Sequence, residues 1–378
     1  MKALNDVVGL TSDLVSINTI NPPGQESECS EFLTNILEKV GFSVEIQTFG
    51  EQRTNLIAKL GSDNKRLPLC FTGHLDTVPL GSTPWTRDPF ITSIEDNKMY
   101  GRGTTDMKGG VAAFCVAASE LAELIEKFSG ITLVITGGEE TGCEGARALQ
   151  TRPDLMTQVG AIIVGEPTSN YPIFGHKGAL WLRGNCAGVT AHGSSPELGD
   201  NAIYKACSAV NKLKTFDFNL LNHNEFGVPT INVGTISGGL NTNSVPDHAA
   251  FEIDIRSLPN QKHAEIRKEV MAATGCDVTY DTILDLQGVL SDTSSPFALR
   301  VGELFGLTKE DLSEVPIAKF FTDASVLTPG FGNPPTIILG PGDIEMAHKT
   351  DEYCRVDALH NAVEIYKKII IDWCEVDT

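Results

Sequence analysis

Apolar runs that are typical of strands alternate with amphipathic helical segments in the first half of the chain. A helical pattern over residues 26–40, which Gly41 is expected to end, precedes the runs SVEIQT, NLIAKL and LPLCFT. Further helical patterns cover residues 107–127 and, near the end of the chain, 356–373. Alternation of strands and helices is typical of layered α/β folds. We therefore predict an α/β fold with a layered mixed sheet.

Four apolar runs each lead directly into a polar, turn-rich segment. LPLCFT runs into GHLD, ITLVIT into GGEE, GAIIVG into EP, and PTIILG into PGDIEMAH. Core packing accounts for the apolar runs but not for the polar residues that follow each of them. Open α/β sheets bind their ligands outside the carboxyl ends of the strands. These segments are therefore expected to form one functional site.

The pattern changes between about residues 178 and 290. Strand-like ALWLRGNCAG is followed by a helical segment over 201–213, by strand-like TINVGTI and AAFEIDIR, and by a helical segment over 261–274. This order predicts a smaller, ferredoxin-like α+β domain with helices on one face of an antiparallel sheet. The GEP segment precedes it and EMAHKTDEY follows it, so we predict an insertion. The predicted ranges are 1–177 and 291–378 for a catalytic domain and 178–290 for the inserted domain.

Composition narrows the classes of partner. The 378 residues, 41% of them hydrophobic, suffice for two globular domains. A formal net charge of −20 argues against nucleic-acid and anionic membrane partners, which require clustered Lys and Arg. The first residues fail the signal-peptide pattern, and no apolar run is long enough to span a membrane. Nine scattered cysteines without a CxxC pair indicate reduced thiols, so a cytoplasmic location is expected.

The polar segments carry imidazoles and carboxylates but no cysteine. Several carboxylates at one site would repel one another unless divalent cations lay among them. Nitrogen and oxygen donors suit zinc, with cobalt or manganese as substitutes. The sequence therefore predicts two zinc ions and a general base. The residues concerned are His74, Asp76, Asp106, Glu139, Glu140, Glu166 and His348.

Each motif has a plainer interpretation when it is taken alone. Asp106 is suited to cap the helix that follows it, and a Glu-Glu pair is common in surface turns. The glycines around Asp106 lack the spacing of nucleotide-binding loops. Burying both Glu139 and Glu140 unpaired after a strand would be costly. A metal ion that binds one of them, while the other accepts a proton from water, removes that cost.

Taken together, the motifs resemble those of the M20 metallopeptidases, especially the branch of acetylornithine deacetylases and succinyl-diaminopimelate desuccinylases. GHLDTVP, GRGTTDMKGG, GGEETG, GEPT, AHGSSP and GPGDIEMAHKTDEY stand in the family's order and approximate spacing over nearly the whole chain. The resemblance implies a dizinc hydrolase in which Asp106 bridges the two ions. His74 and Glu166 would complete the coordination of the first ion, and Glu140 and His348 would complete that of the second.

The resemblance implies further roles. Glu139 would be the general base, Asp76 would support His74, and the peptide bond after Asp106 would be cis. The inserted domain would act as a lid and dimerisation domain, with His192 of AHGSSP polarising the scissile carbonyl across a homodimer. The implied substrate-binding residues are Asn243, Arg256, Thr322 and Lys177, the last of which stands where some relatives have an arginine.

We accordingly predict hydrolysis of the amide bond of a small N-acyl amino acid, by a metal-bridging hydroxide that Glu139 generates. We predict N2-acetylornithine as the first candidate substrate, because GPGDIEMAHKTDEY and FTDAS resemble the deacetylase branch more closely than the desuccinylase branch. This substrate would place the enzyme in arginine biosynthesis. Succinyl-diaminopimelate, other acylated amino acids, dipeptides and carboxypeptidase substrates remain alternatives. An inactive ligand-binding paralogue would be expected to lack Glu139 or a metal ligand. A serine hydrolase would need a GxSxG elbow, which is absent.

Overall fold

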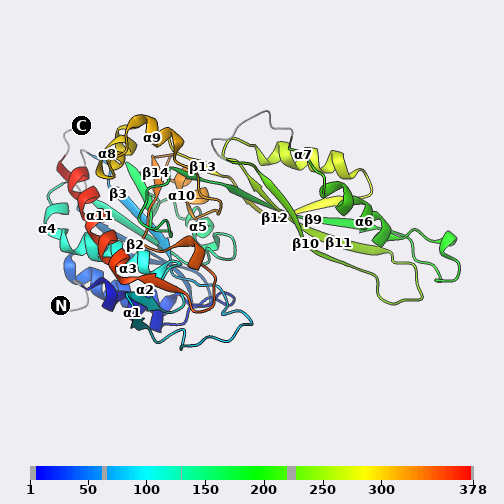
Figure 1. Cartoon of the computed structure of the whole chain (residues 1–378), viewed down its shortest axis with the longest axis horizontal. Helices are drawn as coiled ribbons and strands as arrows, with labels where there is room; N and C mark the ends of the chain where they lie inside the picture. The colour runs from blue at the N-terminus through cyan, green and yellow to red at the C-terminus, as the bar shows by residue number, and fades with distance from the viewer. Residues whose placement is uncertain (1–5, 62–65, 129, 219–226, 376–378) are drawn as a thin grey trace. The chain divides into compact units, whose positions relative to one another are not determined.

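The computed structural model describes residues 6–61, 66–128, 130–218 and 227–375. The contacts between residues divide the chain into two units, both drawn in Figure 1. Unit 1 comprises Met1–Phe174, Ser291–Val315 and Thr322–Thr378. Unit 2 comprises Gly175–Leu290 and Pro316–Phe321.

Unit 1 is built on a six-stranded mixed sheet in the order β1-β2-β6-β3-β7-β14. Four of these strands run parallel to one another, and β2 pairs antiparallel with both β6 and β1. Every residue of the four parallel strands is buried, which explains their continuous apolar runs. The predicted α/β fold with a mixed sheet is confirmed. The strands are β1 (Ser43–Gly50), β2 (Arg53–Leu60), β3 (Leu69–His74), β6 (Ile131–Thr136), β7 (Ala161–Val164) and β14 (Thr336–Ile338).

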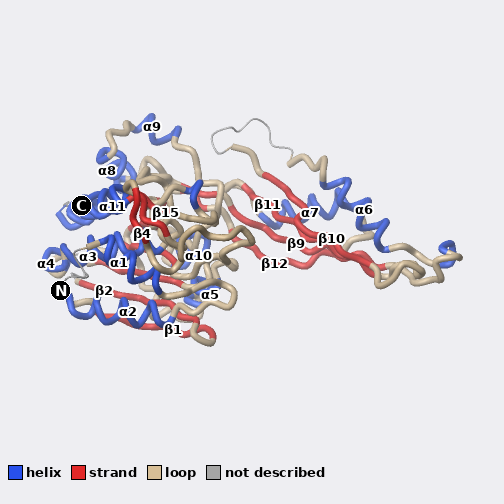
Figure 2. Tube along the Cα trace, turned by 60° about the horizontal axis from the view of Figure 1, so that its bottom comes forward, coloured by secondary structure: helices blue, strands red, loops and turns tan. Residues whose placement is uncertain are grey.

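Three helices of unit 1, α1 (Val7–Ser16), α3 (Lys108–Glu120) and α11 (Val356–Glu375), pack against one another, and Figure 2 shows them beside the sheet. A glycine allows α3 to approach the sheet closely. A Cβ added to Gly110 would lie 2.1 Å from the carbonyl oxygen of Gly165, so only glycine fits there. Among the described residues, none of the helices is both long and apolar enough to cross a membrane.

The helices differ in detail from the predicted segments. The segment 26–40 forms α2 (Ser27–Leu37) and a 3-10 turn, and it ends at Gly41 with φ 102°. The segment 107–127 forms α3 and a separate α4 (Ala122–Ile125). The capping residue of α3 is Met107, so the interpretation of Asp106 as a helix cap is wrong. The shorter helices are α5 (Glu144–Leu149), α8 (Pro296–Leu304), α9 (Lys309–Glu314) and α10 (Ala324–Gly330), and a small sheet joins β15 (Tyr353–Arg355), β5 (Lys98–Tyr100) and β4 (Ser93–Glu95).

Unit 2 contains an antiparallel sheet in the order β10-β11-β9-β12. Its helices α6 (Ala202–Leu213) and α7 (His263–Thr274) pack against each other, and α6 also packs on β9, β10 and β11. The α+β architecture predicted for the insertion is confirmed, and the structure adds a strand, β12, after α7. The strands are β9 (Gly178–Ala187), β10 (Thr230–Gly238), β11 (His248–Ser257) and β12 (Thr279–Leu286).

Unit 2 also includes short segments outside the range 178–290. β8 (Gly175–His176) pairs with β13 (Val289–Leu290). The N–H of Ala318 donates to the carbonyl of Gly175, and the N–H of Lys177 donates to the carbonyl of Ala318, both at 2.9 Å. Because of these backbone hydrogen bonds, unit 2 begins at Gly175 and also includes Pro316–Phe321.

Candidate metal centre

The carboxyl edge of the unit 1 sheet carries the imidazoles and carboxylates that the sequence singled out. His74 is the last residue of β3, Glu139 and Glu140 follow β6, and Glu166 follows β7. His348 lies beyond β14, in a left-handed backbone conformation with φ 63°. Because β3, β6 and β7 are adjacent and parallel, their ends bring these side chains to one place.

Asp106 lies between the two histidines. Its Oδ1 is 3.3 Å from Nε2 of His74, and its Oδ2 is 3.3 Å from Nε2 of His348. A second carboxylate lies beside each imidazole, with Glu166 Oε1 3.7 Å from His74 Nε2 and Glu140 Oε2 3.1 Å from His348 Nε2. The five side chains therefore form two groups, each with one imidazole and one further carboxylate, that share Asp106.

Burial and mutual repulsion act on the ionisation of these groups. Burial raises the pKa of Glu166 well above its usual range and also raises the pKa of Glu140. Burial opposes ionisation of Asp106, but hydrogen bonds from His348 and His74 outweigh it and hold the pKa of Asp106 below its usual range. The bond with Asp106 and a second with Glu140 raise the pKa of His348 to about 10. The contacts with the imidazoles thus favour the ionised form of Asp106, an effect that divalent cations also have.

The donor set fits divalent cations. One donor atom each from His74, Asp106 and Glu140 lie within 4.8 Å of one another. Oε1 of Glu140 is buried and has no hydrogen-bond partner among the described residues, which is costly for a carboxylate oxygen. Nitrogen and oxygen donors suit zinc, cobalt or manganese. The cluster is therefore a candidate metal centre.

Asp76 supports both β3 and the turn after β6. Nδ1 of His74 lies 2.9 Å from the carbonyl oxygen of Asp76 and 3.5 Å from its Oδ1. The Asp76 carboxylate also accepts the backbone N–H groups of Glu139 and Glu140, at 3.1 and 3.2 Å, and the side-chain amide of Asn21 at 2.9 Å. The backbone carbonyl of Asp76 therefore orients His74, and its buried carboxylate holds the Glu139-Glu140 turn.

Glu139 differs from the other carboxylates of the centre. Its residue is 6% exposed, and among the described residues no hydrogen bond or ion pair engages its carboxylate. Burial raises its pKa well above the usual range, and repulsion by Glu166 and Glu140 acts in the same direction, against the attraction of His74. A carboxyl group with a raised pKa and no fixed partner is suited to accept and return a proton.

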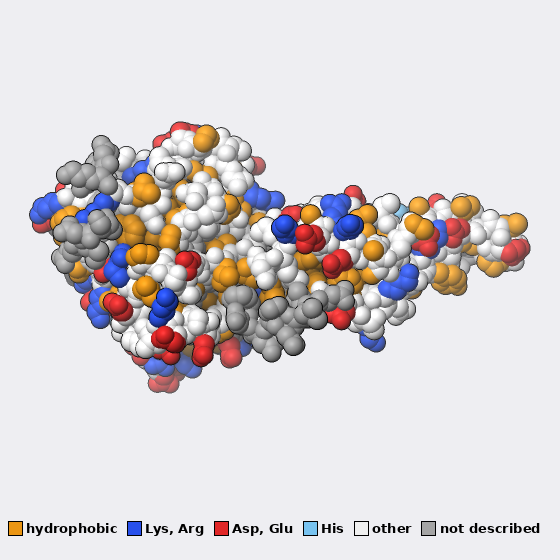
Figure 3. Space-filling view, turned by 90° about the horizontal axis from the view of Figure 1, so that it is seen from above, with side chains coloured by type: hydrophobic (Ala, Val, Ile, Leu, Met, Phe, Trp, Pro, Cys, Tyr) orange, Lys and Arg blue, Asp and Glu red, His pale blue; other side chains and the backbone are white. Residues whose placement is uncertain are grey.

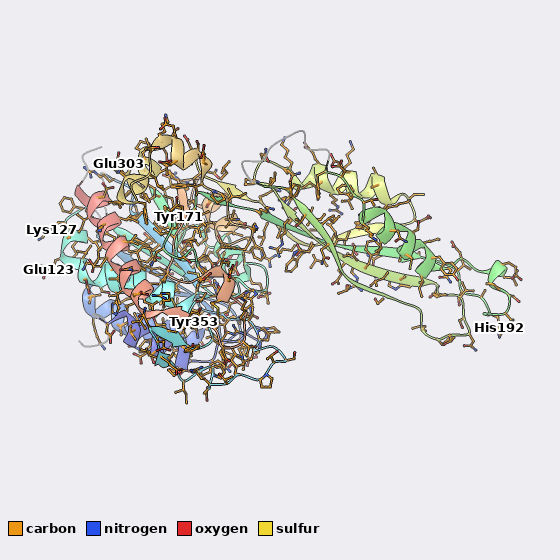
Figure 4. All side chains as sticks on the ribbon, in the orientation of Figure 1. Glu123, Lys127, Tyr171, His192, Glu303 and Tyr353 are labelled. Atoms are coloured by element: carbon orange, nitrogen blue, oxygen red, sulfur yellow. The ribbon has the colours of Figure 1, made fainter. Side chains whose placement is uncertain are left out.

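Two of the predicted site residues meet on neighbouring loops of unit 2. His192, labelled in Figure 4, pairs with Ser244 in an isolated antiparallel bridge, and the N–H of Gly193 donates to the carbonyl of Asn243 at 2.7 Å. The side chains of His192 and Asn243 are both exposed. Nδ1 of His192 lies 3.1 Å from the backbone N–H of Ser194, which donates to it, and 2.7 Å from the Ser194 hydroxyl.

Lys177 and Arg256 belong to a second group in unit 2. Lys177 is 6% exposed, and its ammonium donates to the carbonyl of Val228. Burial lowers the pKa of Lys177, and the nearby charges of Lys319 and Arg256 lower it further. The guanidinium of Arg256 lies 5.3 Å from the centre of the Phe321 ring. Three cations therefore lie near one another in this part of unit 2, and Asp254 pairs with one of them, Arg256, at 2.9 Å.

Thr322 lies in unit 1 and is fully buried. Its hydroxyl accepts the N–H of Ala324 at 3.1 Å. The adjacent Asp323 accepts the hydroxyl of Thr136, the last residue of β6, at 2.5 Å, and burial raises the pKa of Asp323 to about 6. Thr322 is thus packed beside the strand that leads to Glu139.

Two buried charged residues near the centre escaped the sequence reasoning. Glu352 is 0% exposed and forms an ion pair with Arg102, which is 1% exposed, at 2.7 Å. Burial raises the pKa of Glu352 to about 7, although Arg102 and backbone N–H groups lower it. Both residues stand in motifs that the sequence singled out. No local pattern indicates that two residues 250 positions apart form a pair.

The chain is similar to known hydrolases over most of its length. The model of the peptidase family M20/M25/M40 matches residues 70–372. A probable succinyl-diaminopimelate desuccinylase of Staphylococcus epidermidis is 30% identical over 402 residues and covers 98% of each chain. An acetylornithine deacetylase of Proteus mirabilis is 33% identical over 361 residues, which cover 90% of this chain and 89% of that protein.

Solved structures with the same fold span nearly the whole chain. A tripeptidase from Staphylococcus aureus superposes with a TM-score of 0.76 at 22% identity, covering 97% of this chain and 98% of the other. A dinuclear metal-binding peptidase of the M20 family from Bacillus subtilis superposes with a TM-score of 0.68 at 16% identity, covering 98% of both. At these identities the likeness establishes the fold.

Metal-depleted protein is expected to melt at a higher temperature after addition of zinc chloride. Ions that bind only the folded state stabilise it by about 2.7 kcal/mol at a free concentration of 100 times Kd. Asp106→Asn, which neutralises the shared carboxylate, is expected to abolish most of this shift in scanning calorimetry. His360→Asn, at an exposed position of α11, should retain it. An unchanged shift in the Asp106 variant would contradict the candidate centre.

Proposed function

Because the chain belongs to the peptidase family M20/M25/M40 and is a metal-dependent amidohydrolase, we propose that it hydrolyses the amide bond of N-acyl amino acids at the cluster around Asp106. The observation that carries this proposal is the arrangement of two imidazole-carboxylate groups on the two oxygens of one aspartate. An adjacent carboxylate, Glu139, has no fixed partner among the described residues.

We propose that two divalent cations, with zinc preferred, bind at this cluster. His74 and Glu166 would hold one ion, Glu140 and His348 the other, and Asp106 both. The distances of 3.1–3.7 Å between these donors and the neighbouring imidazoles support the grouping. The ions, when bound, supply Lewis-acid polarisation of a carbonyl and lower the pKa of water. Asp76 keeps His74 oriented through the contact at Nδ1.

Glu139 is the proposed general base. Its carboxylate would take a proton from the attacking water and later give it to the nitrogen of the leaving amine. A raised pKa suits both transfers, because a base that returns its proton should have a pKa near the working pH. The bonds from the N–H groups of Glu139 and Glu140 to Asp76 hold this turn in place during both transfers.

We propose that His192 stabilises the developing negative charge on the carbonyl oxygen, and that a partner subunit supplies it in a homodimer formed through unit 2. Ser194 contacts Nδ1 of His192, and a proton on Nε2 would make the imidazole a suitable donor. Among the described strands, β10 stands at an edge of the unit 2 sheet, and an edge strand can pair with a second copy. Unit 2 also exposes the apolar side chains of Leu198, Tyr204, Ile236 and Leu240. Figure 3 shows scattered hydrophobic side chains among charged groups on one face of the molecule.

N2-acetylornithine is the first proposed substrate, in line with the FTDAS and GPGDIEMAHKTDEY segments and with the relative from Proteus mirabilis. Arg256, Asn243 and Thr322 are the proposed substrate-binding residues, and the guanidinium of Arg256 suits the carboxylate of the amino acid. The gathering of Lys177, Lys319 and Arg256 favours a second candidate with an additional carboxylate on its acyl group, such as succinyl-diaminopimelate.

Glu139→Gln is expected to lower kcat by about two to four orders of magnitude, the usual contribution of a positioned proton-transfer group. Zinc content should stay close to that of the unmodified protein, because Glu139 is not among the proposed ligands. Amine release and metal analysis on the same preparations measure both quantities. Substantial remaining turnover would exclude Glu139 as the base.

A panel of N-acetyl, N-succinyl and dipeptide substrates, followed by release of free amine, is expected to show the highest kcat/KM for one of the two proposed substrates. Lys177→Met should lower kcat/KM for succinylated substrates by about ten- to a hundredfold, the range of a hydrogen bond to a charged group. The exposed Lys268→Met serves as the control. Equal losses on acetylated and succinylated substrates would contradict the role given to Lys177.

Mixing the inactive variants Glu139→Gln and His192→Ala after subunit exchange is expected to restore activity. In a mixed dimer, the site that keeps Glu139 receives an intact His192 from the other subunit, and random mixing gives about a quarter of the original activity. If His192 acts within its own chain, every mixed site lacks one of the two groups. If dimers shown to contain one chain of each variant remain inactive, the proposal that a partner subunit supplies His192 is refuted.

A further inference from the structure

Glu352 carries four hydrogen bonds from the segment that ends at Asp106. Its Oε2 accepts Nη1 of Arg102 at 2.7 Å and the backbone N–H of Gly103 at 3.0 Å. Its Oε1 accepts the backbone N–H groups of Thr105 at 2.8 Å and of Asp106 itself at 3.0 Å. A carboxylate has about four lone-pair sites, so these donors fill its capacity.

Backbone contacts fix Glu352 against the same segment. The N–H of Gly101 donates to the carbonyl of Glu352 at 2.9 Å, and the hydroxyl of Thr105 donates to the carbonyl of Tyr353 at 2.7 Å. Tyr353 begins β15, which pairs with β5 directly before Gly101. The carboxylate of Glu352 thus lies inside the curve of the segment 101–106, and the backbone carbonyls of Glu352 and Tyr353 bind the same segment.

Only an ionised carboxylate satisfies this set of donors. A glutamine at position 352 would offer an oxygen on one side but an amide NH2 group on the other. That NH2 group would face two N–H donors, either those of Arg102 and Gly103 or those of Thr105 and Asp106. Both residues of the pair are buried, so water could not replace the lost acceptors without opening the segment.

We infer that Glu352 is a positioning residue that holds Asp106 in the orientation at which its two oxygens face His74 and His348. The inference rests on the proposed function, in which Asp106 is the ligand common to both metal ions. Glu352 touches neither proposed ion and acts through the backbone of Asp106. It also lies four residues after His348, so a single carboxylate connects the segments that carry the shared ligand and one of the histidines.

This role has a signature that distinguishes it from a role in one metal site. Loss of Glu166 or Glu140 is expected to weaken one ion, because each of these carboxylates lies beside one imidazole. Displacement of Asp106 affects both groups at once. A change at Glu352 should therefore weaken binding of both ions, by about the 10- to 100-fold that follows loss of a group supporting a metal ligand.

The test compares Glu352→Gln with Asp372→Asn, which neutralises the acid of the ion pair between Arg300 of α8 and Asp372 of α11. Hydrogen exchange is measured by mass spectrometry on peptides covering residues 101–107, in metal-depleted and zinc-loaded protein. Zinc affinity and stoichiometry are measured by competition with a chelator. Faster exchange of these peptides in metal-depleted Glu352→Gln, with both ions bound at least about tenfold more weakly, is the expected result.

Three results would overturn the inference. They are exchange of residues 101–107 at the unmodified rate, weakening of one ion alone, and an equal effect in Asp372→Asn. If Glu352→Gln does not fold, Glu352→Asp, which keeps the charge on a shorter arm, is measured in the same way. Failure of the proposed function is recognised separately: the unmodified protein would then bind no zinc, while the exchange experiment would still report whether Glu352 holds the segment.

Discussion

The centre depends on keeping several carboxylates buried together at one edge of a sheet. Burial raises the pKa of Glu139, Glu140 and Glu166 because the charged form loses its hydration. The fold imposes this crowding, since β3, β6 and β7 are parallel neighbours whose carboxyl ends coincide. Compensation comes from imidazoles and from backbone N–H groups. Acids whose charge is compensated by imidazoles can bind a ligand. Acids whose charge is compensated by backbone N–H groups instead hold those ligand-binding acids in place.

Asp76 and Glu352 belong to the supporting kind. Backbone N–H groups of the Glu139-Glu140 turn donate to Asp76, and those of the segment before Asp106 donate to Glu352. Backbone amides do not titrate, so these acceptors hold the main chain at every pH at which they remain ionised. Asp106 instead faces two imidazoles, which a metal ion can replace as partners. The same side-chain chemistry therefore serves structure in one place and ligand binding in the other.

Periodicity predicted the elements whose burial is regular, and failed where it is not. α1 was missed because its buried face includes Thr11, whose hydroxyl donates to the carbonyl of Val7. β12 was missed because an irregularity between Thr282 and Leu284 interrupts the alternation of buried and exposed residues. Local motifs singled out the residues of the centre. They could not indicate the bonds from the segment before Asp106 to Glu352, which join residues about 250 positions apart.

The substrate is harder to predict than the type of reaction, because similar substrates differ only slightly in their binding free energy. A pocket that distinguishes acyl groups by one methylene gains only about 1–3 kcal/mol. A buried charge that is left without a partner costs more. The acceptor of the nearly buried Lys177 ammonium is a neutral carbonyl, that of Val228, and the like charges of Lys319 and Arg256 increase the cost of burying the ammonium. The number of carboxylates on the substrate should therefore influence its binding more strongly than the length of its acyl group.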